Sequence, residues 1–587
     1  MFILKKQKWF QWNHKLVVRR NGILLQKQSF RSGVMKKIII LISAIIFSVN
    51  VFSQAVDWLW ARAAGGSNND YGNSVATDGS GHVYMTGFFE SASITFGTTT
   101  LFNAGPTGTP DMFLAKYDSL GNVLWAKSAG GNYYDKSYSV AVDGNGNIFV
   151  TGYFYSATIV FGTVTLNNPG AGYADMFIVK YNSGGTVLWA KSAGGIDSDI
   201  SYCVATDGNG NVYATGYFIS PSITFGTITL NNPGYPASEI FIVKYNASGT
   251  VLWAKSTGGV YADAGSGVAV DGSGNVFLTG NFTSSTVTFG TTTLTSSGGS
   301  NIFITKYDST GTVRWARTSE GSSADYGNAV ATDGNGNVYV TGYYSYFPII
   351  FGTDTLDNAG QSDLFVVKYD SVGSVLWSRS AGGSNDDIGI SVATDGSGNI
   401  YLTGHFFSSS ITFGTTSLIN DGNNDIFVVK YNSAGNAFWA KRAGGVAPES
   451  GQGVAIDAYD NVYVTGIFNS TSLSFGTTVL NNSGAGSSDI FLARIDSFDV
   501  GIEEPGYDRA VCIFPNPATN EIKVQSSTFK VQRVEIYDVM GQKCLTPTLS
   551  KGEGVSASIN VSELIAGIYF VKVKAGKREQ VFKLVKQ

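Results

Sequence analysis

The stretch Asp271-Gly272-Ser273-Gly274-Asn275, followed by Val276-Phe277-Leu278-Thr279-Gly280, decides the fold. Its first half supplies the glycine and asparagine of a tight hairpin turn, and its second half is typical of a β-strand. The turn aspartate recurs eighteen residues after a tryptophan in each of seven units. The seven tryptophans stand 62 to 65 residues apart, at Trp60, Trp125, Trp189, Trp253, Trp315, Trp377 and Trp439. Such a period indicates a repeat architecture.

Each unit predicts four short antiparallel strands. A strand of small residues such as 74–77 precedes the turn, and the strand 276–280 follows it. After a long connection come a third strand, as at 302–307, and a fourth that carries the tryptophan, as at 313–316. Four strands repeated seven times predict an all-β protein with a seven-bladed β-propeller.

The two ends of the array predict how the ring closes. The array begins at residues 57–60 with a lone fourth strand and ends at residues 490–494 with a third strand. We therefore expect the N-terminal strand to complete the last blade, which leaves no open edge in the ring.

Composition and charge narrow the class of protein. The 587 residues are 43% hydrophobic and only 14% charged, with 73 glycines, which excludes a disordered tail and argues against a helical protein. The net charge of −4 conceals three segments: ten basic and no acidic residues in 1–54, 17 and 36 in 55–505, and 12 and seven in 506–587. The acidic centre argues against nucleic acid as a partner and suits cations or neutral ligands such as sugars.

The N-terminal segment has the pattern of an export signal. Met35-Lys36-Lys37 precedes an apolar run at 38–47 and a polar stretch of small residues that ends at Gln54. This pattern predicts a signal peptide at 35–53, and the apolar run is too short to span a membrane. We therefore expect no transmembrane span in the mature chain. Residues 1–34 are interpreted as a spurious upstream extension, with translation starting at Met35.

The repeat resembles a known family. Val-Ala-Thr-Asp-Gly-Ser-Gly-Asn-x-Tyr-x-Thr-Gly, followed by Asp-Ile-Phe-Val-Val-Lys-Tyr-x-Ser-x-Gly, is similar to the bacterial seven-bladed β-propeller repeat, SBBP. The resemblance covers about residues 57–496 and implies the fold but no particular activity. We assign residues 54–499 to the propeller and 500–511 to a linker.

Residues 512–587 alternate like a small Ig-like β-sandwich. They are similar to the type A C-terminal sorting domain of type IX (Por) secretion. The motif residues are Pro515, Asn516, Pro517, Asp538, Gly541, Gly567 and Tyr569. The resemblance implies that the type IX machinery is a partner and that the protein is released from the cell or anchored at its surface. The alternative is an ordinary Ig-like binding module.

Seven acids stand ten residues after the tryptophans, just before the strand of small residues. They are Asp70, Asp135, Asp199, Asp263, Asp325, Asp387 and Glu449. One interpretation places them around one mouth of the central channel, where they would bind a cation or a cationic ligand. The favoured alternative is that each acid accepts backbone N–H groups in a tight turn.

Other candidate sites are weak. The Asp-Gly-x-Gly-Asn turns resemble calcium loops, but glycines occupy ligand positions, so no cofactor is expected and calcium is a weaker alternative. His82 and His405 are not repeated, so no catalytic set is predicted. Cys203 stands where other units have small residues and is interpreted as a packing residue. Cys512 and Cys544 are a candidate disulfide pair.

These features favour a secreted or surface-anchored, non-enzymatic propeller that binds a glycan or another surface protein. The long connection between the second and third strands is the expected binding surface, and its length differences predict a surface loop. Tyr153, Tyr217 and Tyr343 either stack on sugar rings there or pack at blade edges. Two alternatives remain. One is an extracellular enzyme that degrades polysaccharide or peptide with acids on one face, and the other is a purely structural or adhesive element.

Overall fold

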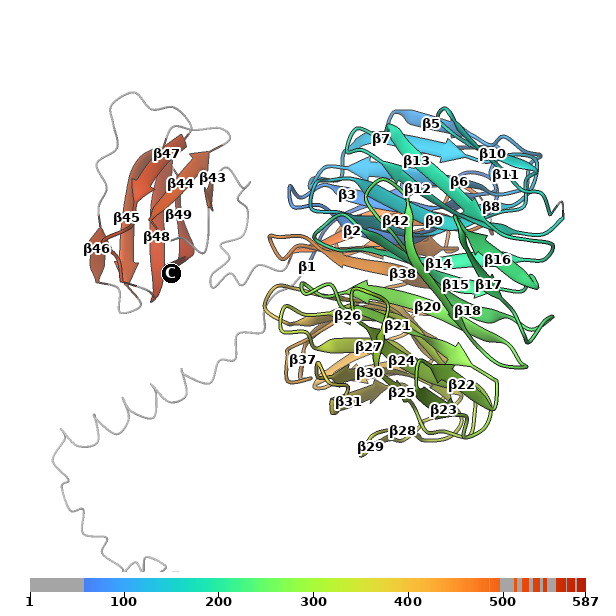
Figure 1. Ribbon diagram of the computed structural model, residues 1–587. Helices are drawn as coiled ribbons and strands as arrows, with labels where there is room; N and C mark the ends of the chain where they lie inside the picture. The colour runs from blue at the N-terminus through green and yellow to red at the C-terminus, as the bar shows by residue number, and fades with distance from the viewer. Residues whose placement is uncertain are drawn as a thin grey trace, which may run out of the picture. The chain divides into compact units, whose positions relative to one another are not determined.

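The computed structural model describes residues 57–170, 172–484, 486–496, 511–514, 520–526, 531–538, 542–545, 556–565, 567–575 and 578–586. The signal peptide predicted at 35–53 and the stretch 1–34 lie outside these residues. The chain divides into two units, Met1–Asp499 and Val500–Gln587. Every element in the described residues is a β-strand (Figure 1), and none of them forms a helix that could cross a membrane.

Seven four-stranded antiparallel sheets make up the first unit, as the repeat predicted. The first strand of each sheet contacts the first strands of its neighbours and is therefore innermost. These strands are β2 (Asp70–Thr77), β8 (Asp135–Val142), β14 (Asp199–Thr206), β20 (Asp263–Val270), β26 (Asp325–Thr332), β32 (Asp387–Thr394) and β38 (Glu449–Ile456). We number the blades 1 to 7 in this order.

The second and third strands are almost entirely buried in every blade, which accounts for their continuous apolar sequences. The second strands are β3 (Val83–Phe89), β9 (Ile148–Phe154), β15 (Val212–Phe218), β21 (Val276–Phe282), β27 (Val338–Ser345), β33 (Ile400–Phe406) and β39 (Val462–Phe468). The third strands are β6 (Asp111–Tyr117), β12 (Asp175–Tyr181), β18 (Glu239–Tyr245), β24 (Asn301–Tyr307), β30 (Ser362–Tyr369), β36 (Asp425–Tyr431) and β42 (Asp489–Asp496).

The fourth strands confirm the expected closure. They are β7 (Val123–Ala129), β13 (Val187–Ala193), β19 (Val251–Thr257), β25 (Val313–Thr318), β31 (Val375–Ala381), β37 (Ala437–Ala443) and, in blade 7, the N-terminal β1 (Asp57–Ala64). Strand β1 pairs with β42 in a register that runs from Asp57 with Asp496 to Ala64 with Ile490. The two ends of the array therefore share one sheet.

Each blade also carries a two-stranded hairpin that was predicted to be loop. The Phe-Gly pair forms its turn, because Gly97 has a φ of 59° that suits glycine. The hairpins, which lie at the periphery in Figure 1, are β4–β5 (Ser93–Phe96, Thr99–Phe102), β10–β11 (Thr158–Phe161, Val164–Asn167), β16–β17 (Ser222–Phe225, Ile228–Asn231), β22–β23 (Thr286–Phe289, Thr292–Thr295), β28–β29 (Ile349–Phe351, Asp354–Leu356), β34–β35 (Ser410–Phe413, Thr416–Ile419) and β40–β41 (Ser472–Phe475, Thr478–Asn481). Only the segment after the hairpin varies in length.

The repeated tryptophan joins each blade to the next. Trp377 donates its indole N–H to the carbonyl of Ser433, which lies in the turn between the third and fourth strands of blade 6 (3.2 Å). Lys368 Nζ donates to the same carbonyl (3.0 Å). We call this pair of bonds the latch. At the closure, Trp60 and Arg494 both donate to Ser119 of blade 1 and so make the same latch.

The closure leaves one latch incomplete. In blade 7 the third and fourth strands come from opposite ends of the array, so no turn connects them. Trp439 of blade 6 would donate to that turn, and its buried indole nitrogen has no partner among the described residues. The neighbouring Lys430 lies instead 4.0 Å from Asp395.

The second unit is a small two-sheet sandwich, as predicted. One sheet has the order β43-β44-β47 and the other β46-β45-β48-β49. The strands are β43 (Val511–Phe514), β44 (Glu521–Ser526), β45 (Val531–Asp538), β46 (Lys543–Leu545), β47 (Ser556–Asn560), β48 (Gly567–Ala575) and β49 (Arg578–Lys586). Their core includes Ile522, Val534 and Val571. Cys544 is a free cysteine in the structure, and the side chain of Cys512 lies outside the described residues.

Candidate functional site

The seven acids of the predicted ring stand at the start of the innermost strands, at the end of the propeller that carries the long connections. We call this end the loop face. This position at the start of the innermost strands agrees with the sequence, but the acids are buried rather than open to solvent. Every one of the seven is at most 2% exposed: Asp70, Asp135, Asp199, Asp263, Asp325, Asp387 and Glu449. The expectation of an acidic ring open at the channel mouth is therefore wrong, because the loops cover these side chains.

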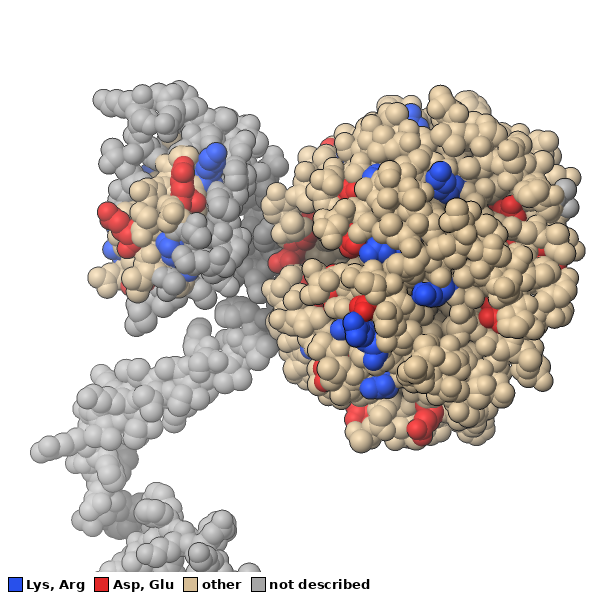
Figure 2. Space-filling view, in the orientation of Figure 1, with Lys and Arg blue, Asp and Glu red and all other residues tan. Residues whose placement is uncertain are grey.

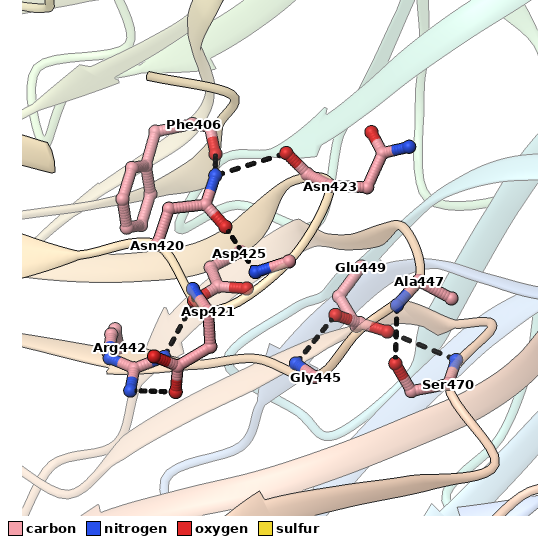
Figure 3. A network of polar contacts seen from close by, with 11 residues as sticks. Phe406, Asn420, Asp421, Asn423, Asp425, Arg442, Gly445, Ala447, Glu449 and Ser470 are labelled. Carbon is pink, nitrogen blue, oxygen red and sulfur yellow. Dashed lines mark hydrogen bonds and ion pairs between the residues drawn. The ribbon is translucent and has the colours of Figure 1, made fainter. Parts of the chain in front are cut away.

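Hydrogen bonds within the loops explain the repeated acid. Asp135 Oδ2 accepts the backbone N–H of Gly131 (2.7 Å) and the hydroxyl of Ser156 (2.7 Å), and its Oδ1 accepts the N–H of Ser156 (3.3 Å). Glu449 does the same with Gly445 and Ser470 (Figure 3). The interpretation of these acids as acceptors of backbone N–H groups is confirmed for these residues.

A second set of polar side chains lies beside the first, at the start of the third strands. Its members are likewise at most 2% exposed: Asp111, Asp175, Glu239, Asn301, Asp363, Asp425 and Asp489. We call the two sets together the carboxyl band. A Cβ atom added to Gly130 would lie 1.9 Å from Asp111 Oδ1. The first glycine of the repeated Ala-Gly-Gly therefore leaves room for this carboxyl. Blade 4 differs from the other blades at both positions: Asn301 stands where they have an acid, and Glu320 stands where they have this glycine.

Burial raises the pKa values of carboxyls in the carboxyl band, because desolvation disfavours their ionised forms. Desolvation raises the pKa of Asp111 to about 6 and that of Asp135 to about 7, and the negative charge of Asp111 adds to the rise at Asp135. Several oxygens of the second set have no partner among the described residues: Asp111 Oδ1, Asp175 Oδ1, Glu239 Oε1, Asp363 Oδ1, Asp425 Oδ1 and Asp489 Oδ1. Ionising the band is therefore costly for the fold.

Among the described residues, only blade 6 has an arginine in contact with a carboxyl of the second set. Arg442 NH1 lies 2.6 Å from Asp425 Oδ2, and the same guanidinium contacts Asp421 (Figure 3). Burial raises the pKa of Asp425, and the charge of Arg442 opposes that rise. Residues equivalent to Arg442 in the other blades are small, such as Ser128 and Ser192.

The Asp-Gly-x-Gly-Asn turns satisfy their own carboxylates. Asp143 Oδ1 accepts the backbone N–H groups of Asn145 and Asn147 (both 2.9 Å), and Oδ2 accepts the Asn147 side chain (2.7 Å). In blade 1, His82 replaces that asparagine and contacts Asp78 Oδ2 at 2.8 Å. These bonds support the turn interpretation. Among the described residues, no group of three or more His, Cys, Asp and Glu side chains is placed to hold a metal ion.

The two remaining candidates are held inside the blades. His405 contacts Ser450 Oγ at 2.8 Å, and burial lowers its pKa to about 4, so the imidazole is neutral at physiological pH. Cys203 contacts the carbonyl of Val268, and burial raises the pKa of its thiol. Cys203 is therefore a small packing residue, as expected.

Tyrosines of blades 2 and 3 form a feature that sequence reasoning missed. Their rings make a continuous series of contacts, with centroids 5.3 to 6.2 Å apart. In order of contact, the series is Tyr134, Tyr155, Tyr153, Tyr138, Tyr202 and Tyr217. We call it the tyrosine sector. It runs from a loop of the loop face to the innermost strands β8 and β14. Blades 1, 5 and 7 carry amides at the position of Tyr138: Asn73, Asn328 and Gln452.

Exposed tyrosines also lie in the loops of blades 2 and 3. Tyr133 is 62% exposed and Tyr134 is 49% exposed in the loop before β8, while Tyr173 and Tyr235, each 47% exposed, lie in the long connections of blades 2 and 3. Tyr153 itself is buried and packs at a blade edge. The long connections are thus apolar and aromatic where they are exposed in blades 2 and 3.

Part of the predicted sorting motif lies in the described residues. Asp538 ends β45 and Gly567 begins β48. Tyr569 donates its hydroxyl to the carbonyl of Ile565 (3.0 Å). Pro515, Asn516, Pro517 and Gly541 lie outside the described residues.

Two family models match the chain. A model described as a beta-propeller repeat, SBBP, matches residues 118–153, 315–343 and 376–405. A model described as a secretion system C-terminal sorting domain matches residues 512–587. Both matches agree with the resemblances seen in the sequence.

Curated relatives match at low identity. An uncharacterized WD repeat-containing protein of Acanthamoeba polyphaga mimivirus is 25% identical over 560 residues, which cover 77% of this chain and 40% of that protein. The regulatory protein FlaEY of Caulobacter vibrioides is 26% identical over 57% of this chain and 36% of its own length. The chain spans less than half the length of either relative.

Two solved structures align with most of this chain at low structural similarity and low sequence identity. A protein of unknown function from Dyadobacter fermentans has a TM-score of 0.34 and 10% identity, over 75% of this chain and 99% of that one. YCF48 bound to a D1 peptide has a TM-score of 0.34 and 10% identity, over 76% and 99%.

The sorting domain implies that the chain interacts with the type IX secretion machinery, and it makes the protein extracellular or attached to the cell surface. Segments of the propeller thus match the SBBP beta-propeller repeat, and the C-terminal residues that follow them match the secretion system sorting domain.

Proposed function

We propose that this protein is a non-enzymatic, extracellular binding propeller that takes a glycan through its tyrosine sector. The observation that carries the proposal is the continuous series of six tyrosine rings, which joins exposed rings of the loop face to the innermost strands. Aromatic faces are suited to stack on the apolar faces of sugar rings, and phenol hydroxyls bond sugar hydroxyls.

The chemistry of the tyrosine sector suits a neutral ligand. Burial raises the pKa of Tyr202 to about 12, so its hydroxyl stays a neutral donor at physiological pH. The hydroxyl of Tyr235 bonds to Asp197, which raises the pKa of that tyrosine. The two tyrosine hydroxyls are themselves uncharged donors, and the charges beside the tyrosines of blades 2 and 3 include those of Asp197 and of Lys136, whose Nζ lies 6.0 Å from the ring centre of Tyr134.

The enzyme alternative lacks a comparable observation. A glycoside hydrolase of the usual kind needs two carboxyls about 5–9 Å apart that reach the substrate in a cleft. The residues of the carboxyl band are at most 2% exposed, and acids of its first set such as Asp135 and Glu449 bond to the loops that cover them. Binding is therefore the function that the exposed groups of this face support best.

A glycan array probed with the full secreted chain tests the proposal. We expect one class of neutral glycan to bind, and Tyr134→Ala and Tyr155→Ala to weaken binding about tenfold each, which corresponds to the loss of one stacking platform. Tyr459→Ala is the matched control, because Tyr459 is 60% exposed in a turn at the opposite end of the blades. Unchanged binding by both sector variants, or turnover of a bound glycan, would refute the proposal.

A further inference from the structure

A cleft of about 540 Å³ lies on the outside of the propeller, between blade 4 and the neighbouring turn of blade 5. It is lined by Asn275, Thr292, Lys306, Arg314, Trp315, Arg317, Ser371 and Val372. Three of these residues are cations and none is an acid. In Figure 2, Lys and Arg stand in small groups on a mostly uncharged surface, and residues 55–505 have 36 acids against 17 basic residues. A cleft with three cations is therefore unusual in this propeller.

Two of the cations are held by backbone carbonyls of blade 5. Lys306 Nζ donates to the carbonyl of Ser371 (3.0 Å), and Arg317 Nε donates to that of Gly373 (3.0 Å). Arg317 also donates from NH1 to Ala316 (2.8 Å) and from NH2 to Val372 (3.4 Å), so two of its five N–H groups remain for a further partner. Lys306 is 9% exposed and keeps two of its three. Their positive charges are held at one side of the cleft without a carboxylate among the lining residues.

The third cation, Arg314, distinguishes this blade from the other six. The residue before the repeated tryptophan is apolar in every other blade: Leu59, Leu124, Leu188, Leu252, Leu376 and Phe438. Only blade 4 places a guanidinium there. The arginine is thus no requirement of the fold.

Asp308 orients this guanidinium. Arg314 NH2 lies 2.6 Å from Asp308 Oδ2, and the side chain of Arg314 is 60% exposed. Hydrogen bonds from Thr310 and Thr312, together with the charge of Arg314, lower the pKa of Asp308 to about 2, so the carboxylate stays ionised. The contact uses one of the five N–H donors of Arg314, and the others remain for a ligand.

We propose that this cleft binds the carboxylate of an acidic sugar, as a second glycan site separate from the tyrosine sector. Two guanidiniums and one ammonium match a planar carboxylate, which arginine binds in a bidentate manner. Thr292 and Asn275 line the same cleft and offer polar groups to sugar hydroxyls. The volume lies in the range of small-molecule sites and is sufficient for a sugar unit.

The experiment measures binding of oligogalacturonate to the full secreted chain at low ionic strength, where charge contacts are least screened. The arms are the methyl-esterified oligomer, which has lost its carboxylates, and inorganic sulfate as a competitor. Arg314→Leu introduces the residue that five other blades have at this position, so we expect it to leave the fold intact. We expect this variant to bind oligogalacturonate at least tenfold more weakly and the methyl ester to bind no better than a neutral oligosaccharide.

A gain-of-function variant completes the test. Blade 5 already holds Lys368, which donates to Ser433, and Arg379, which donates to Gly435. Asp354 stands in blade 5 where blade 4 has Thr292, so the double variant Leu376→Arg, Asp354→Thr rebuilds the three cations without a lining acid, and we expect it to restore binding in the Arg314→Leu background.

Three results would overturn the proposal: no binding of oligogalacturonate by the natural chain, equal binding by Arg314→Leu, or equal affinity for the methyl ester. Displacement of the oligomer by millimolar sulfate would overturn the assignment to a carboxylate, because any oxyanion would then suffice. Loss of neutral-glycan binding through Tyr134→Ala, with oligogalacturonate binding unchanged, supports two independent sites.

Discussion

Replacing Asp111 by asparagine is expected to change how the stability of the propeller depends on pH. Asp111 is 1% exposed, accepts one backbone N–H from Ala104 (2.6 Å), and has a second oxygen without a partner among the described residues. Asn301 occupies the equivalent position in blade 4, so the fold accepts an amide there. The amide oxygen of the variant still accepts the N–H, and the charge is removed.

The size of the effect follows from the pKa. Burial raises the pKa of Asp111 from 3.8 to about 6 in the folded protein. Because the folded pKa is the higher one, the folded state binds the proton more tightly, and this stability is lost as the pH rises from about 4 through 6. Two pKa units correspond to about 3 kcal/mol of unfolding free energy at pH 8.

Urea unfolding of the natural chain and of Asp111→Asn at pH 4.5 and at pH 8 measures this difference. We expect the variant to gain about 2 kcal/mol relative to the natural chain between the two pH values, because the unfolded carboxyl is already largely ionised at pH 4.5. Asp308→Asn is the control without pH dependence, because the pKa of Asp308 is lowered to about 2, so its carboxylate is ionised and contributes equally at pH 4.5 and at pH 8. Identical pH dependence for Asp111→Asn and the natural chain would refute the reasoning.

Three further predictions use the repeat as its own control. Trp377→Phe is expected to cost about 1 kcal/mol more in thermal unfolding than Trp439→Phe, because only Trp377 loses a hydrogen bond; equal costs would contradict the latch. Gly130→Ala is expected to cost about 1–3 kcal/mol, because its Cβ would overlap Asp111, whereas Gly79→Ala has open space around it; a neutral Gly130→Ala would show that the carboxyl can move away. Calcium followed by chelator is expected to leave Tm unchanged, because Asp143 uses both oxygens within its turn; a rise in Tm with calcium would revive the metal interpretation.

Much of the fold could be predicted because the repeat places the same residue types at the same spacing. The turn at Asp271 and the strand after it predicted the blades. The array begins with a fourth strand and ends with a third, which predicted closure by β1. The hairpins were missed although a signal was present. Ile94 and Phe96 alternate before Gly97, and both are at most 1% exposed, but the long connection was assigned to loop as a whole.

The candidate site was less predictable. The register placed Asp70 and its equivalents at the correct end of the innermost strands, but a carboxylate has the same sequence signal whether it is exposed or covered by a loop. Burial depends on how the loops fold over it. The tyrosine sector depends on contacts between blades, such as that of Tyr138 with Tyr202, and no spacing within one unit reveals them. Arg314 falls within the predicted fourth strand 313–316, and only the cleft reveals a role for its side chain.

The closure by β1 and β42 has a consequence for the order of folding. Pairing Asp57 with Asp496 closes a loop of about 440 residues, which costs about 5 kcal/mol of chain entropy. The hairpins within a blade close loops of a few residues and cost far less. Blades can therefore form one after another along the chain, but the ring is completed only when the last propeller strand is present to meet the first. Any C-terminal truncation that removes β42 should leave an open arc rather than a smaller ring.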